Sequence, residues 1–197
     1  MLTTVLRKLI QTWRIHRDPI GYARSLGVTI GSDCRLICLT PATFGSDPYL
    51  IRIGNHVTIT AGVRFITHDG AVWVFRKRDP EIDVIAPIVI GNNVFVGTNA
   101  LLMPGVTIGD NTVIAAGAVV TRDVPTGFVA AGVPARCVKT LDEYWEKVRD
   151  RAFHIRSKPL AEKRDIWLGH FFPAPGSHTR ATGGPKAGEN DASRASA

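Results

Sequence analysis

A six-residue spacing of aliphatic side chains is the feature that most restricts how this chain can fold. In IGNNVFVGTNALLMPGVTIGDNTVIAAGAVVTRDV, residues 90–124, every sixth position of one frame is Ile, Leu or Val. These positions are Ile90, Val96, Leu102, Ile108, Ile114 and Val120. A helix repeats its apolar side chains every three or four residues and a strand every two, so neither element alone explains the spacing.

The residues between the aliphatic positions indicate short strands joined by corners. Three positions after each aliphatic residue the chain carries Asn, Gly or Asp, the types that best tolerate left-handed backbone angles. These residues are Asn93, Asn99, Gly105, Asn111, Gly117 and Asp123. The position after each of them is small or β-branched. Each hexad therefore predicts a short strand, an inward side chain and a corner, and successive hexads should stack into a β-solenoid.

Shorter blocks with the same spacing precede residue 90. Ile30 opens a first hexad, residues 40–50 form a turn-rich excursion, and Ile53, Ile59 and Phe65 make a second in-frame block. The separation between Phe65 and Ile90 is not a multiple of six. Residues 67–87 must therefore leave the repeat, and we expect them to form an excursion loop.

Helices are expected on both sides of the repeat domain, which we place at 28–140. Residues 1–27 form an amphipathic helix and lead-in, whose apolar face packs on the body or on a neighbouring subunit. Peripheral membrane contact is the alternative for this helix. Residues 141–170 are predicted to form a helical cap, and 171–197 a disordered tail of low complexity.

Composition restricts the partners and the compartment. The chain is 45% hydrophobic and 21% charged, which is typical of a globular protein, and it has no apolar run of the about 18 residues that span a bilayer. Its three cysteines form no CxxC pair, so we expect a reduced, cytoplasmic protein. The net charge of +7 comes without a nucleic-acid-binding motif, and therefore favours a phosphorylated small molecule over DNA or RNA.

The in-register repeat and the closing AAGVPARCVK, residues 130–139, resemble the hexapeptide-repeat acyltransferases. The later hexads are similar to the galactoside and maltose acetyltransferase group. FITHDGAVWVF is similar to sugar acetyltransferases of surface-polysaccharide synthesis, such as perosamine N-acetyltransferases. The resemblance implies an all-β, left-handed parallel β-helix with short N-terminal and C-terminal α-helices. It also implies acetyl-CoA as co-substrate, no metal, and a homotrimer with sites between subunits.

His68, in FITHDG, is the candidate general base. It occupies the corner position of the Phe65 hexad, where the chain leaves the repeat, and an imidazole pKa of about 6.5 suits proton transfer. Members of the family carry their base in a matching context. Asp69 has three possible roles: it orients His68, it binds the acceptor, or it shapes the turn with Gly70.

The resemblance implies that the cofactor contacts lie in the later hexads. Phe95 stands where relatives often have tryptophan, and Thr98 is the candidate donor to the thioester oxyanion. The remaining candidates are Gly97, Ala115, Ala116, Thr121, Arg122, Arg136 and Lys139. The small residues let a cofactor approach the backbone or simply suit the repeat, whereas the cations match positions that meet coenzyme A phosphates.

These features predict an acetyltransferase that moves an acetyl group from acetyl-CoA to a sugar hydroxyl or amine. The resemblance favours surface-polysaccharide biosynthesis, such as O-antigen or exopolysaccharide, with a nucleotide-linked amino sugar as one acceptor. In the excursion loop, Trp73, Phe75 and Arg76 are the candidates for acceptor binding, or else form the loop's own small core. The alternatives are an antibiotic or free-glycoside acetyltransferase, a zinc hydratase with three histidine ligands, and a non-enzymatic scaffold.

Overall fold

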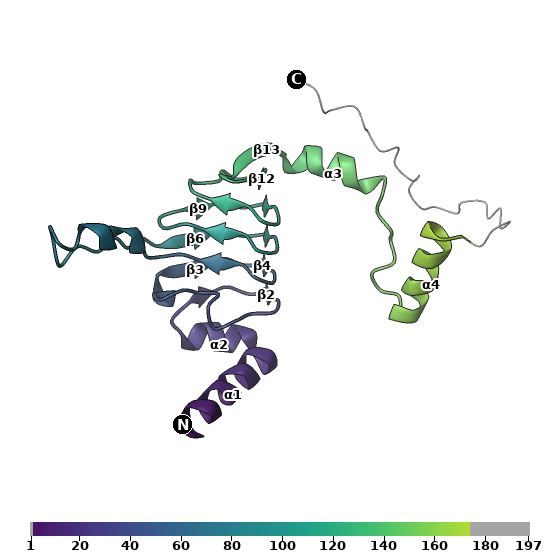
Figure 1. Ribbon diagram of the computed structural model, residues 1–197. Coiled ribbons are helices and arrows are strands. Elements are labelled where there is room, and N and C mark those ends of the chain that lie inside the picture. Colours follow the sequence, from purple (N-terminus) through teal and green to yellow (C-terminus); the bar gives the residue numbers. More distant parts are fainter. Residues whose placement is uncertain (1, 174–197) are drawn as a thin grey trace. The chain divides into compact units, whose positions relative to one another are not determined.

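The computed structural model describes residues 2–173 (Figure 1). They divide into two compact units, residues up to 142 and residues from 143 onward. Nearly all of the predicted tail, 171–197, lies outside the described residues. Every strand described below belongs to the first unit.

The strands of the first unit form three sheets. The first sheet contains β1 (Thr29–Ile30), β3 (Ile51–Ile53), β6 (Ile88–Ile90) and β9 (Thr107–Ile108). The second contains β2 (Arg35–Leu36), β4 (Thr58–Ile59), β7 (Val94–Val96), β10 (Thr112–Ile114), β12 (Phe128–Ala131) and β13 (Arg136–Thr140). The third contains β5 (Arg64–Phe65), β8 (Leu101–Leu102) and β11 (Val119–Val120). All paired strands are parallel except β12 and β13.

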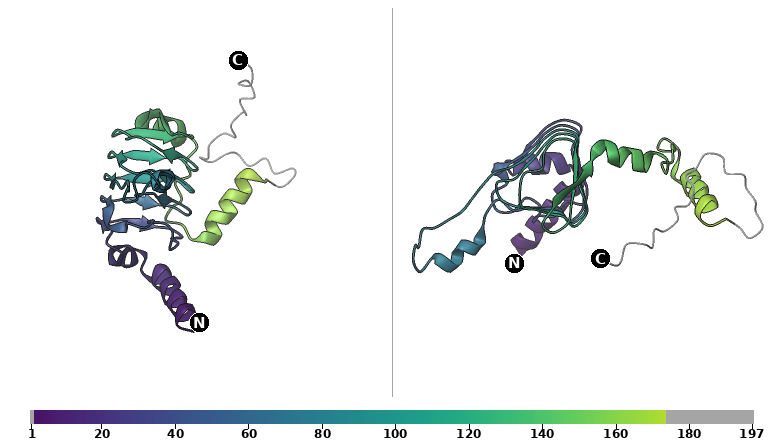
Figure 2. Two further views of the ribbon diagram at one scale, coloured as in Figure 1. Left: turned by 60° about the vertical axis from the view of Figure 1, so that its left-hand side comes forward. Right: turned by 90° about the horizontal axis from the view of Figure 1, so that it is seen from above.

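Consecutive strands pass from the first sheet to the second and third and then return to the first. The strands β3–β5, β6–β8 and β9–β11 each make one such circuit, called a coil below. Figure 2 shows the coils nearly superposed when the first unit is seen from above. The prediction of parallel strands with helices beside them is confirmed.

The inward side chains of the six-residue frame form ladders inside the coils. Because every hexad moves the chain on by one sheet, residues of the frame after the excursion loop pair with the residue three hexads further on, as Ile90 does with Ile108. Pairs on either side of the loop, such as Ile53 and Ile90, are separated by the loop residues as well. The ladders are Ile53–Ile90–Ile108, Ile59–Val96–Ile114 and Phe65–Leu102–Val120, all of them buried. Burying each such side chain stabilises the fold by about 1.5–3 kcal/mol.

The corners follow the predicted chemistry with one exception. Five of the six predicted corner residues have positive φ angles: Asn93, Asn99, Gly105, Asn111 and Gly117. Asp123 does not, so that prediction is wrong for it. Its carboxylate instead accepts a hydrogen bond from the Thr107 backbone N–H at 2.7 Å, which ties this corner to the adjacent coil without a left-handed residue.

Two helices precede the first coil. They are α1 (Leu2–Arg17) and α2 (Pro19–Ser25), separated by Asp18, whose side chain caps α2. The short α2 buries Tyr22 and Ala23 and contacts β1 and β2, so it covers the start of the coils. Two 3-10 helices lie outside the strands, η1 (Pro48–Leu50) and η2 (Gly70–Phe75). The second of these lies in the excursion loop, which projects from the coils in Figure 1.

The second unit contains most of α3 (Leu141–Arg149) and all of α4 (Leu160–Phe171). Within it the rings of Phe153, His170 and Phe171 form an aromatic cluster, with centroids 4.7–5.8 Å apart. Across residues 2–173, none of the helices combines the length and the apolar character needed to cross a membrane.

Candidate active site

His68 lies at the base of the excursion loop, directly after the third sheet. Its backbone forms an isolated antiparallel bridge with Ile85, in the part of the loop that returns to the coils. The Asp69 N–H donates to the Val84 carbonyl at 2.8 Å, and the Ala86 N–H donates to the Thr67 carbonyl at 2.9 Å. These bonds close the base of the loop on both sides of His68 and fix the position of its backbone.

Two carboxylates face the His68 imidazole from opposite sides. The Nε2 atom is 3.2 Å from Asp83 Oδ1, and the Nδ1 atom is 4.0 Å from Asp47 Oδ2. The Asp83 side chain is 43% exposed and that of Asp47 only 14% exposed, while His68 itself is 32% exposed. The imidazole is therefore reachable from solvent on the Asp83 side and enclosed on the Asp47 side.

Asp47 is held in place by a segment that packs on the third sheet. The Phe44 ring lies 5.4 Å from the Phe65 ring, and the Phe65 N–H donates to the Thr43 carbonyl at 2.8 Å. The Tyr49 hydroxyl donates to Asp47 Oδ1 at 2.8 Å, and this hydrogen bond raises the pKa of Tyr49. The other oxygen, Asp47 Oδ2, is buried and has no hydrogen-bond partner, so it remains available to the imidazole.

Sequence reasoning did not identify Asp47 or Asp83. The structure gives Asp69 the turn-forming role that was one of its three predicted alternatives, because its carboxylate accepts from the Ala71 N–H at 3.0 Å and caps η2. No periodicity marks Asp47 or Asp83, since both lie in segments outside the repeat. Only the path of those segments brings the two carboxylates to His68.

The candidate Thr98 lies on a different edge of the coils from His68. It follows β7, at the corner between the second and third sheets, whereas His68 follows β5, at the corner that leads back to the first sheet. Its exposed hydroxyl lies 3.4 Å from the Thr60 hydroxyl of the adjacent coil. Within one chain, the candidate base and the candidate oxyanion donor thus lie at opposite ends of the strands of the third sheet.

Gly97, Ala115 and Ala116 share the edge of Thr98. Gly97 is buried, and a Cβ added to it would lie 2.5 Å from Ala116 N and 2.7 Å from Ala115 C. The absence of a side chain at Gly97 is therefore required by the close approach of two coils. This supports the alternative in which the small residue suits the repeat itself, while Ala116 is exposed on the outer side of the same edge.

The remaining cofactor candidates lie in two places. Thr121 and Arg122 follow β11 at the same edge as His68, two coils further along. Since neighbouring coils are separated by the usual strand spacing, this offset is about 10 Å along the stack. Arg136 and Lys139 lie on β13 at the end of the second sheet, where the Arg136 guanidinium bonds to the Ala135 carbonyl at 2.8 Å.

Phe95 projects from the outer face of the second sheet. It pairs with Thr58 and Val113 on the adjacent strands and is 45% exposed. A pocket of about 210 Å³ opens beside it, bordered also by His56 and Asn93. The His56 Nδ1 and Asn93 Oδ1 atoms are 2.8 Å apart, so His56 is hydrogen-bonded at the corner between the first and second sheets, a different corner from that of His68.

The acceptor candidates Trp73, Phe75 and Arg76 are exposed on the excursion loop. The loop buries Val72, but the two aromatic rings do not form a core of their own. Within the described part of the chain, no three histidine, cysteine, aspartate or glutamate side chains gather where they would hold a metal ion.

Comparison with known proteins identifies the family. Residues 87–122 match the model described as bacterial transferase hexapeptide (six repeats). Protein CapG of Staphylococcus aureus is 51% identical over 148 residues, which are 75% of this chain and 86% of that protein. The chain belongs to the bacterial hexapeptide-repeat transferases. The predicted resemblance is thereby confirmed, and with it the prediction of a transferase.

Two further relatives of this transferase have named activities. The galactoside O-acetyltransferase of Escherichia coli is 38% identical over 110 residues, 56% of this chain, and the match spans about half (51%) of that enzyme. A hexapeptide-repeat acetyltransferase from Vibrio cholerae has a similar structure, with a TM-score of 0.51, 30% identity, and coverage of 61% of this chain and 78% of that one. The same Vibrio enzyme has been solved in complex with acetyl-CoA, with a TM-score of 0.50 and 26% identity over 66% of this chain and 83% of that one.

Proposed function

We propose that this transferase moves an acetyl group from acetyl-CoA to a sugar hydroxyl or amine. The observation that carries the proposal is the His68 imidazole, fixed at the base of the loop, with one side enclosed by Asp47 and the other facing solvent. The relatives named as acetyltransferases, and the acetyl-CoA complex of one of them, support the donor. The circuit of strands through three sheets supports the left-handed parallel β-helix that the family resemblance implies.

The proposed chemistry is a direct transfer in a ternary complex. His68 accepts the proton of the acceptor hydroxyl as the acceptor oxygen attacks the thioester carbonyl carbon. The carbon–sulfur bond then breaks, and the imidazolium returns the proton to the departing thiolate. Thr98, through its hydroxyl or backbone N–H, is proposed to stabilise the developing oxyanion.

The two carboxylates have different proposed roles in this reaction. Asp47 is enclosed and faces Nδ1 at 4.0 Å, so its carboxylate is suited to orient the ring and to stabilise the positive charge that the imidazole gains when Nε2 accepts a proton. Nε2 is 3.2 Å from Asp83 Oδ1 in the free protein, and the acceptor hydroxyl would take the place of that contact. Asp83 lies beside Nε2 on an exposed loop, where the acceptor must also arrive. We therefore assign Asp83 to acceptor binding through a hydrogen bond from a sugar hydroxyl or amine.

A site shared between two subunits is the arrangement that best brings together the candidate base His68 and the candidate oxyanion donor Thr98. Within one chain His68 and Thr98 occupy different edges of the coils, at the two ends of the strands of the third sheet. An adjacent copy would place its Thr98 edge against the His68 edge of the first. This supports the proposed homotrimer, in which Phe95 and the cations of Arg122 and Arg136 bind acetyl-CoA.

The acceptor is proposed to be a sugar, in keeping with the galactoside named for one relative. Exposed aromatic and cationic residues of the excursion loop suit a glycan or a sugar linked to a nucleotide pyrophosphate. Trp73, Phe75 and Arg76 supply these groups close in sequence to His68. Synthesis of a bacterial surface polysaccharide and a cytoplasmic location remain predictions from the resemblance and the composition.

Thiol release from acetyl-CoA tests the proposal directly. Purified protein is incubated with galactosides, nucleotide-linked amino sugars and chloramphenicol, and wild type is compared with His68→Ala and the control His154→Ala. We expect turnover with a sugar acceptor, a loss of about 10²–10⁴-fold in His68→Ala, and no change in the control. Unaltered turnover in His68→Ala would remove His68 from the mechanism, and failure to bind acetyl-CoA would refute the transfer itself.

A further inference from the structure

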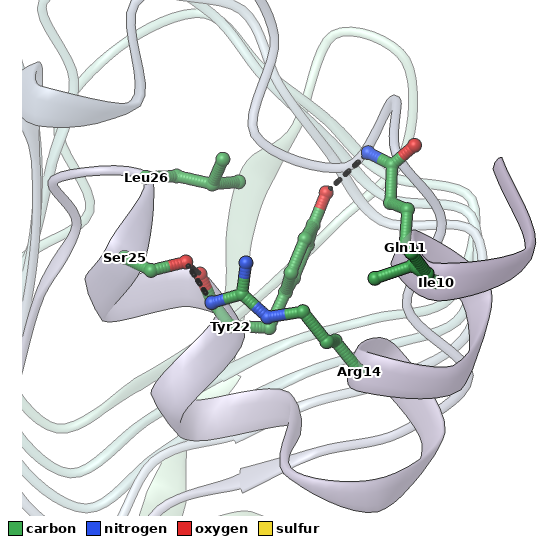
Figure 3. Close-up of a pocket in the computed structure, with 6 residues that line it drawn as sticks. All are labelled: Ile10, Gln11, Arg14, Tyr22, Ser25 and Leu26. Atoms are coloured by element: carbon green, nitrogen blue, oxygen red, sulfur yellow. Dashed lines mark hydrogen bonds between the residues drawn. The ribbon is translucent and has the colours of Figure 1, made fainter. Parts of the chain in front are cut away.

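Helix α1 carries an apolar stripe that the described chain leaves uncovered. The stripe consists of Leu6, Leu9, Ile10 and Trp13, each of which is at least 50% exposed. Their spacing of three and four residues places them on one side of the helix. Ile10 also borders a shallow pocket of about 410 Å³ between α1 and α2 (Figure 3).

A different side of α1 attaches the helix to the first unit. Figure 3 shows Gln11 Nε2 donating to the Tyr22 hydroxyl at 2.8 Å and the Arg14 guanidinium donating to Ser25 Oγ at 3.0 Å. Ile15 is buried against the same part of the unit. The helix is thus held by its polar contacts and by Ile15, whereas the apolar stripe lies on the solvent-exposed side of the helix.

All the charged residues of α1 are basic. The helix contains four Arg or Lys residues and no Asp or Glu: Arg7, Lys8, Arg14 and Arg17. The Arg17 guanidinium lies 5.1 Å from the centre of the Trp13 ring, next to the stripe. A tryptophan and leucines on one side of a helix, together with a net positive charge and an arginine beside the tryptophan, are typical of helices that lie in the interface of an anionic bilayer. A second copy of α1 would supply no acidic side chain to pair with these cations, so homotypic packing of the helix is electrostatically unfavourable.

We propose that α1 binds the surface of an anionic membrane, with the apolar stripe inserted among the lipid headgroups and the net positive charge of the helix attracting the anionic lipids. The helix would lie in the plane of the interface and anchor the coils beside it. Acetyl transfer is not required for this binding, so the proposal stands independently of the proposed function.

Vesicle flotation with the full chain tests the proposal. Wild type, Leu9→Ser/Trp13→Ser and the control Leu160→Ser/Leu168→Ser are mixed with phosphatidylcholine vesicles that contain or lack phosphatidylserine. The control removes two exposed leucines from α4 and leaves α1 unchanged. We expect wild type and control to float with the anionic vesicles, in proportions that fall as salt rises, and the α1 variant to bind at least about tenfold more weakly.

Light scattering on the same samples separates membrane binding from self-association. The expected result is the same oligomeric state in all three proteins. Equal flotation of wild type and the α1 variant, or no flotation of wild type on anionic vesicles, would overturn the proposal. So would a lower oligomeric state in the α1 variant, because it would identify a second copy of the chain as the partner of the stripe.

Discussion

Replacing Gly97 with alanine should destabilise the coils strongly, although it adds only one methyl group. The added Cβ would lie 2.5 Å from Ala116 N, 2.7 Å from Ala115 C and 2.8 Å from Ile114 O. All three contacts are with the backbone of the adjacent coil, which cannot move aside as a flexible side chain can. Overpacking of this kind typically costs about 1–3 kcal/mol, and the rigid neighbours place Gly97→Ala at the upper end, about 3 kcal/mol.

Urea unfolding followed by circular dichroism at one fixed protein concentration measures this cost. Gly70→Ala is the matched control, because a Cβ at Gly70 would have no atom within 4 Å and Gly70 does not have a positive φ angle. We expect the urea midpoint of Gly97→Ala to fall with an unchanged m-value, and that of Gly70→Ala to stay near wild type. Equal midpoints for the two variants would refute the argument that the coils meet at Gly97.

Four further predictions concern the site and the core. Asp47→Asn should lower kcat about a hundredfold with little change in the acceptor KM, because the His68 imidazole would no longer be aligned with the acceptor hydroxyl, whereas the groups that bind the acceptor are unchanged. Steady-state kinetics over a pH series measures this effect. Asp83→Asn should mainly raise the acceptor KM in the same assay. Leu102→Ala should cost about 2–5 kcal/mol in urea unfolding, since Leu102 is fully buried in the middle of a ladder. The Tyr49–Asp47 hydrogen bond, which raises the pKa of Tyr49, stabilises the fold fully below a pH of about 10, and this contribution is lost as the pH rises through the raised pKa. The difference in melting temperature between wild type and Tyr49→Phe should therefore narrow in alkaline buffer.

Much of the repeat was predictable because its geometry is local. An inward side chain at every sixth position and a corner three residues later define one side of a coil, and residues such as Ile90 and Ile108 then stack without further information. The interruption before Ile90 likewise located the excursion loop. Asp123 departs from the pattern because a side-chain hydrogen bond to the adjacent coil takes the place of the left-handed backbone, and no hexad spacing encodes that bond.

The arrangement around His68 was decided only by the tertiary structure. The sequence determined that a histidine stands where the chain leaves the repeat, and it offered Asp69 as the neighbouring carboxylate. The carboxylates that face the imidazole are instead Asp47 and Asp83, from two segments whose lengths and turns follow no period. The physical reason is that a repeat fixes positions by counting along the chain, whereas a loop is positioned by the hydrogen bonds and packing at its base, here those of Phe44 on the third sheet and of the backbone on both sides of His68.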